Sequence, residues 1–96
     1  MAAYIWATVK GGEPAAFMAY AKAAAEVAAG FGGEYVVRGV IEEVFEGECE
    51  DAGRAILIRF ADADSARAYM ASEGYQAAKA LRAGAGGAVN SRLVVA

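Results

Sequence analysis

The chain has 96 residues, of which 58% are hydrophobic and 22% are charged. This length suits a single domain over residues 1–96, but so apolar a chain leaves more apolar surface than a small monomer buries, so we expect a partner chain. The net charge of −3 and the scattered lysines and arginines exclude the clustered basic patch of a nucleic-acid-binding protein.

Two residue types that support much of enzyme chemistry are scarce. The chain has no histidine, which removes the commonest general base and the commonest metal ligand. Its one cysteine, Cys49, excludes an intrachain disulfide, and the acidic residues around it disfavour a reactive thiolate. The sequence therefore indicates no metal site and no cofactor.

The N-terminal segment Tyr4–Val9 alternates bulky and small side chains and ends at two glycines, which predicts a strand and a turn. It lacks the basic residues that open a signal peptide. No segment reaches the roughly 18 apolar residues of a membrane span. We therefore expect a cytoplasmic protein without a membrane partner.

A helix is predicted next. Pro14 suits the first turn of a helix, and strong helix formers follow over Ala15–Ala29. The glycines of residues 30–33 end this helix, because glycine readily adopts the left-handed conformation of a helix cap.

Two further strands are predicted with a polar loop between them. The first covers Tyr35–Glu46, with a bulge expected at Gly39, and the loop runs over Gly47–Gly53. The second covers Arg54–Phe60, where isoleucine and phenylalanine alternate with other residues.

The C-terminal third predicts two short helices and a last strand. Asp62, Asp64 and Ser65 are N-cap residues for a helix that ends at Ala71. A second short helix covers Gln76–Arg82, and the last strand covers Ala88–Val95.

The resulting order, βαββαβ, is the split pattern of ferredoxin-like α+β folds. Four strands form an antiparallel sheet with the helices on one face only. The other face would be left without cover, so we expect a second sheet to pack against it.

Several segments resemble the "domain of unknown function 1330" family. They are Phe31–Gly39, Phe45–Gly47, Ile58–Phe60, Ala66–Tyr69 and Ser72–Gln76. The resemblance implies a dimeric α+β barrel, formed by a homodimer with its two sheets face to face. It implies no established activity, although the wider superfamily includes monooxygenases that use no metal or flavin, and isomerases.

Arg38 is the leading candidate for a ligand-binding residue. A charge within a half-buried strand is costly unless a counter-charge or a ligand compensates it, and the adjacent Gly39 leaves room for a close approach. Arg59 lies on the strand face opposite Ile58, where its guanidinium could hold a carboxylate or pair with an acid of the twin chain.

Each of the remaining candidate residues could have a structural role instead of a ligand-binding role. Trp6 and Tyr75 could line a pocket, but aromatic residues at such spacings are also typical of a core or a dimer interface. Ser72 could bind a ligand at a helix break or simply cap a helix. Glu46 and Arg54 are expected to face each other across the hairpin as a structural ion pair.

The arginines and the lysine of the C-terminal helices are interpreted as a solvated face. These residues are Arg67, Lys79 and Arg82.

Three functions follow from these residues. The first is binding of a small anionic or aromatic molecule in a pocket near Arg38. The second is a cofactor-independent enzyme of the monooxygenase or isomerase kind, and the third is a structural dimerisation module without a ligand.

Overall fold

The computed structural model describes residues 1–47 and 53–96, so Cys49 lies outside the described residues. Seven elements follow one another along the chain. They are β1 (Ala3–Lys10), α1 (Pro14–Gly30), β2 (Glu34–Val40), β3 (Arg54–Phe60), α2 (Ala63–Ala71), α3 (Glu73–Ala80) and β4 (Ala88–Val95).

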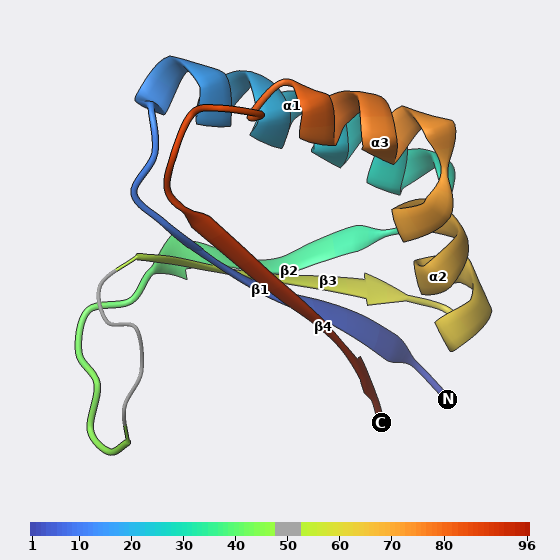
Figure 1. Ribbon diagram of the computed structural model, residues 1–96. Helices are drawn as coiled ribbons and strands as arrows, with labels where there is room; N and C mark the ends of the chain where they lie inside the picture. Colours follow the sequence, from blue (N-terminus) through green and yellow to red (C-terminus); the bar gives the residue numbers. More distant parts are fainter. Residues whose placement is uncertain (48–52) are drawn as a thin grey trace.

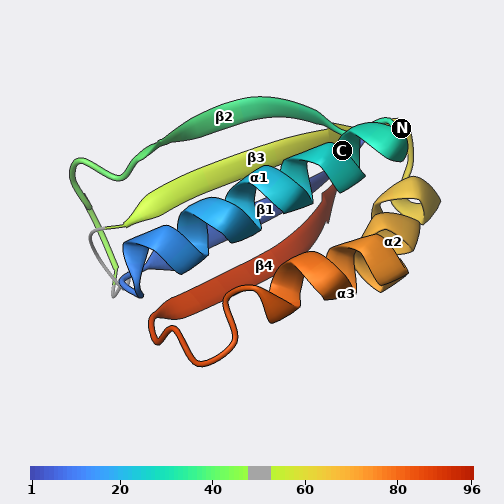
Figure 2. The same cartoon turned by 90° about the horizontal axis from the view of Figure 1, so that it is seen from above.

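The strands form one antiparallel sheet in the order β2-β3-β1-β4 (Figure 1). All three helices lie on the same face of this sheet, with α1 beside α3 (Figures 1 and 2). The ferredoxin-like α+β fold expected from the element order is confirmed. In the described part of the chain, no helix combines the length and the apolar character needed to cross a membrane.

Local interactions fix the two ends of α1. The Glu13 carboxylate accepts hydrogen bonds from the backbone N–H groups of Ala15 and Ala16 at 2.6 and 3.3 Å, which caps the N-terminus. At the other end, Gly32 adopts a positive φ of 79°, as expected for a glycine helix stop. A Cβ at Gly33 would lie 2.9 Å from a carbonyl oxygen of the helix, so the exit from α1 requires glycine there.

The second strand is shorter than predicted. It ends at Val40, which lies opposite Arg54, and the N–H of Ile41 donates to the carbonyl of Gly53 at 2.7 Å. Glu46 therefore lies in the connection beyond the ladder, and no Glu46–Arg54 ion pair forms among the described residues. The predicted register was wrong because a strand continues only as far as its partner does, and β3 offers no residue before Arg54.

The irregularity in β2 also lies elsewhere than predicted. The register shifts between Tyr35 and Val37, not at Gly39, so β2 carries one extra residue there. Arg38 then lies opposite Ile56, on the same face as Tyr35. In a regular strand these two side chains, three residues apart, would point to opposite faces of the sheet.

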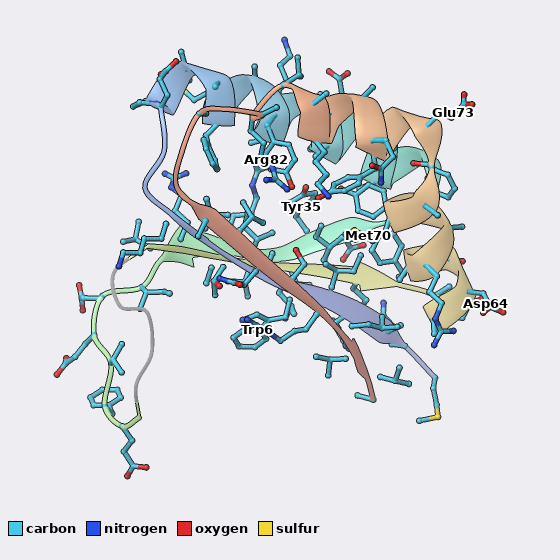
Figure 3. All side chains as sticks on the ribbon, in the orientation of Figure 1. Trp6, Tyr35, Asp64, Met70, Glu73 and Arg82 are labelled. Carbon is cyan, nitrogen blue, oxygen red and sulfur yellow. The ribbon has the colours of Figure 1, made fainter. Side chains whose placement is uncertain are left out.

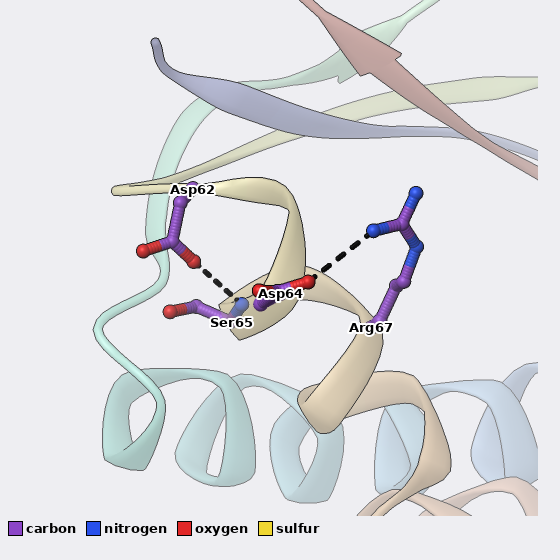
Figure 4. Close-up of polar contacts among 4 residues, drawn as sticks. All are labelled: Asp62, Asp64, Ser65 and Arg67. Atoms are coloured by element: carbon purple, nitrogen blue, oxygen red, sulfur yellow. Dashed lines mark hydrogen bonds and ion pairs between the residues drawn. The ribbon is translucent and has the colours of Figure 1, made fainter.

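Figure 4 shows the start of α2. The Asp62 carboxylate accepts a hydrogen bond from the N–H of Ser65 at 2.7 Å, which lowers the pKa of Asp62, and Arg67 forms an ion pair with Asp64 at 3.3 Å (Figure 4). The helix that follows, α3, begins at Glu73 rather than at Gln76, because Ser72 caps it.

The sheet has one buried and one open face. On the helix side, Ile5, Ile58 and Phe60 are at most 5% exposed and pack against the helices. The alternate residues of the same strands point away from the helices, among them Trp6, which is 43% exposed (Figure 3). The structure thus confirms that Ile58 and Phe60 face the helices and that Arg59 lies on the other side.

Candidate functional site

A cavity of about 50 Å³ lies between the helices and the sheet. We call it the inner cavity. Its lining combines apolar side chains of β1 and β3 with polar side chains of β2 and the helices. The polar-tipped members are Tyr20, Tyr35, Arg38, Tyr69 and Tyr75.

The tyrosines of the inner cavity form a packed cluster. The rings of Tyr69 and Tyr75 lie 5.1 Å apart edge to face, and Tyr20 lies 6.2 Å from Tyr75. The Tyr20 and Tyr75 hydroxyls are hydrogen bonded to each other at 2.9 Å, and the Tyr69 hydroxyl donates to the carbonyl of Ala24 at 3.3 Å. Tyr69 is thus committed to the core, whereas the other two hydroxyls share one bond.

Burial favours the neutral phenols of Tyr20, Tyr35 and Tyr69. It raises the pKa of Tyr20, and the hydrogen bond to the Tyr75 hydroxyl raises it further, whereas the Arg82 guanidinium opposes the rise. Burial likewise raises the pKa of Tyr35, with Arg38 acting in the opposite direction, and it raises the pKa of Tyr69. Neutral hydroxyls can donate hydrogen bonds to an anion.

Two arginines stack on this cluster. The guanidinium of Arg82 lies 4.7 Å from the ring centroid of Tyr20, and that of Arg38 lies 4.8 Å from the ring centroid of Tyr35. Neither guanidinium forms an ion pair with any residue that the structure describes. The Nε of Arg82 is buried and has no hydrogen-bond partner there.

Arg82 is the functional candidate that the sequence interpretation missed. We expected it on a solvated helix face, and this was wrong because α3 ends at Ala80. Arg82 follows in a turn, and its side chain enters the space between the helices and the sheet (Figure 3). The glycines from Gly84 onward were the only sequence signal that the helix stops near this point.

The other candidates divide between the two faces of the sheet. Arg38 and Tyr75 meet in the inner cavity, as the sequence suggested for Arg38. Trp6, Gly39 and Arg59 lie on the open face, as their partners in the ladder show, and do not reach the cavity.

Ser72 acts as a cap on two helices. Its hydroxyl donates to the carbonyl of Tyr69 at 2.7 Å, at the end of α2, and accepts from the N–H of Tyr75 at 3.0 Å, in the first turn of α3. This hydroxyl therefore holds two tyrosines of the cavity in their relative positions. It supports the site without lining it.

A comparison of the sequence with known protein families finds one match. The model described as "Domain of unknown function (DUF1330)" matches residues 2–95. No similar protein was found among proteins with curated functions.

Several solved structures share the fold at low sequence identity. A protein of unknown function from Rhodopseudomonas palustris is 13% identical, with a TM-score of 0.74 over 97% of this chain and 80% of that chain. SnoaB, a cofactor-independent oxygenase from Streptomyces nogalater, is 18% identical, with a TM-score of 0.66 over 99% and 91% of the two chains.

A third similar structure is described as a dimeric ferredoxin-like protein of unknown function. It comes from a Jannaschia species and is 19% identical, with a TM-score of 0.66 over 100% of both chains. Two other matches are also described as dimeric. At these identities the likeness shows the fold alone.

Proposed function

The chain belongs to the DUF1330 family, whose description assigns no activity, and from the geometry of the inner cavity we propose that it binds a small anionic molecule there. Arg82 and Arg38 would supply the positive charge, and the Tyr20–Tyr75 hydroxyl pair would supply a neutral donor. Support comes from the buried Nε of Arg82, which has no hydrogen-bond partner among the described residues.

The unpartnered Nε of Arg82 is the observation on which the proposal rests. A buried donor without a partner is costly, and native proteins rarely keep one without a reason. A guanidinium stays charged at any relevant pH, and its planar set of N–H groups matches the two oxygens of a carboxylate. Arg82 does not itself line the inner cavity but stacks on Tyr20, which does, so an anion bound beside that ring is the partner that we propose for this donor.

The hydroxyl pair adds a second donor. In the bond between Tyr20 and Tyr75, one hydroxyl donates its proton to the other, which leaves the second proton available. Because the pKa of Tyr20 is raised, this hydroxyl does not repel an anion by ionising.

Arg38 would contribute from the sheet side of the cavity. Its guanidinium is already held over the Tyr35 ring, so little conformational freedom remains to be lost when an anion binds.

A second candidate function is cofactor-independent oxygenation of a bound phenol. Among proteins of this fold, SnoaB is described as a cofactor-independent oxygenase. The arginine donors that favour a carboxylate would also stabilise an ionised phenol oxygen. Oxygen consumption with a panel of polyphenols tests this function, and the absence of consumption across the panel would reject it.

We also propose a homodimer formed through the open face of the sheet. This face exposes Trp6, Val37 and Val94 at 40% or more, a larger apolar surface than water-facing sheets usually carry. A second copy of the same face would bury it, in keeping with the dimeric description of proteins that share the fold.

Thermal unfolding with added sodium acetate or sodium formate tests anion binding, with sodium chloride at equal ionic strength as the reference. Both anions are small enough for the inner cavity. We expect a saturable rise in Tm for the native protein. Arg82→Met should weaken binding roughly tenfold or more, since a hydrogen bond to a charged group is worth about 1.5–3 kcal/mol.

The matched control is Lys79→Met, which removes an exposed cation of α3 that lines no cavity. It should bind acetate as the native protein does. A Tm that does not respond to either anion would reject the proposal, as would an equal response in the Arg82→Met variant.

A further inference from the structure

A second, larger cavity of about 350 Å³ opens between α2 and β4. We call it the groove. It is lined by Ile5, Ala66, Arg67, Met70, Ala71, Ser91, Arg92 and Leu93. It exists because short side chains face each other across it, Ala66 and Ala71 from α2 and Ser91 from β4.

The groove and the inner cavity adjoin. Ile5, Met70 and Ser91 line both of them. Figure 3 shows Met70 between α2 and the sheet, on the same side of the sheet as Tyr35 and Arg82. A methionine side chain is unbranched and adapts its shape readily, so Met70 can shift to join the two spaces.

The two volumes suit different chemical groups. The inner cavity, at about 50 Å³, has room for a carboxylate but not for a ring, because an engineered cavity that takes benzene measures about 150 Å³. The groove, at about 350 Å³, exceeds that size by more than a factor of two. Arg38 lines the small space, and Arg82 stacks on Tyr20 in its wall. Of the two arginines that line the groove, Arg67 forms an ion pair with Asp64 and Arg92 lies opposite Trp6, whose side chain is on the open face, and the rest of that lining is mostly apolar.

We propose that the inner cavity and the groove form one site for an amphipathic carboxylate. The carboxylate lies in the inner cavity, which Arg38 lines and where Arg82 stacks on Tyr20 of the wall, and an apolar chain or ring system lies in the groove, with Met70 between them. This inference rests on the proposed anion binding and adds the class of ligand, a monocarboxylate with an apolar body.

Calorimetric titration of the full chain with sodium octanoate, sodium acetate and octan-1-ol tests the proposal. Each methylene that octanoate buries beyond acetate strengthens binding by about fourfold. We expect octanoate to bind at least tenfold more tightly than acetate, and octan-1-ol, which lacks the anion, to bind more weakly than octanoate.

Variants that fill the groove test whether the apolar part of the ligand lies there. Ala71→Leu enlarges an exposed residue at the end of α2 that lines the groove alone, and Leu93→Trp fills the groove from β4 at a position that also lines the groove alone. Each variant should lower the affinity for octanoate at least tenfold. The ratio of octanoate affinity to acetate affinity should therefore fall. Ala68→Leu, an equal change on α2 outside both cavities, should leave octanoate binding unchanged.

These titrations distinguish a failure of the combined site from a failure of the proposed anion binding. If acetate binds and octanoate binds no more tightly, or if both groove variants keep the native ratio of affinities, the groove is not part of the site. If Arg82→Met keeps native octanoate affinity, the carboxylate does not lie in the inner cavity. Absence of binding by both carboxylates would reject the proposed function itself.

Discussion

Replacing Arg82 by methionine should leave the protein as stable as before or make it more stable. Methionine keeps the length and the apolar contacts of the arginine stem but removes the buried Nε, which has no partner among the described residues. A residue retained at a cost to stability is what a ligand-binding role predicts.

Two opposing contributions determine how much Arg82→Met changes the free energy of unfolding. Removing an unsatisfied buried donor relieves about 1–3 kcal/mol. Losing the guanidinium 4.7 Å above the Tyr20 ring forfeits about 0.5–2 kcal/mol. The two ranges centre on a net gain of about 1 kcal/mol, which corresponds to a rise in Tm of about 4–8 °C in a domain of this size.

Equilibrium unfolding in urea, followed by circular dichroism at a fixed protomer concentration, measures this change. Lys79→Met is the control for loss of a positive charge and should alter the free energy of unfolding by less than about 1 kcal/mol. A loss of more than about 2 kcal/mol in Arg82→Met would show that the guanidinium has structural partners, and the reasoning would fail.

Three further predictions concern the tyrosines, the shared cap and the open face. Tyr20, Tyr35 and Tyr69 have pKa values above the ordinary 10.0, so their neutral forms stabilise the fold fully below pH 10 and this contribution is lost as the pH rises further. Their phenolate absorbance should therefore appear together with alkaline unfolding, and ionisation near pH 10 in a folded protein would contradict the burial argument. Ser72→Ala removes the cap and should lower the free energy of unfolding by about 0.5–2 kcal/mol, measured by urea unfolding, whereas Ser72→Thr should keep most of it; equal losses in both would argue against capping. If the proposed dimer forms through the open face, Trp6→Glu should convert it into a folded monomer in sedimentation velocity, because the substitution places a charge on that face; an unchanged dimer would exclude this face as the interface.

Local patterns were enough to predict most of the fold. Alternating apolar residues gave the bounds of β3 without error, because that strand has one buried face, and the predicted bounds of β4 are also correct. The length of β2 could not be predicted in this way. The residues after Val40 still include the β-favouring Ile41, Val44 and Phe45, but the end of the ladder depends on where β3 begins.

The candidate site could be predicted only in part, because its geometry depends on contacts distant in sequence. Arg38 was identified as a charge within a strand, yet its face depends on the extra residue between Tyr35 and Val37. Arg82 was missed because a helical pattern continues through it, whereas the chain leaves the helix two residues earlier. Neither a register shift nor a turn that folds back leaves a periodic signal in the sequence.

The extra residue in β2 also bears on how insertions and deletions act in this sheet. Loss of Val36, the residue between Tyr35 and Val37, would restore a regular ladder and leave Arg38 opposite Ile56, on the same face as Tyr35. Keeping Val36 in a regular ladder would instead place Tyr35 and Arg38 on opposite faces, so the bulge, and not the length of the strand, holds the guanidinium of Arg38 over the Tyr35 ring.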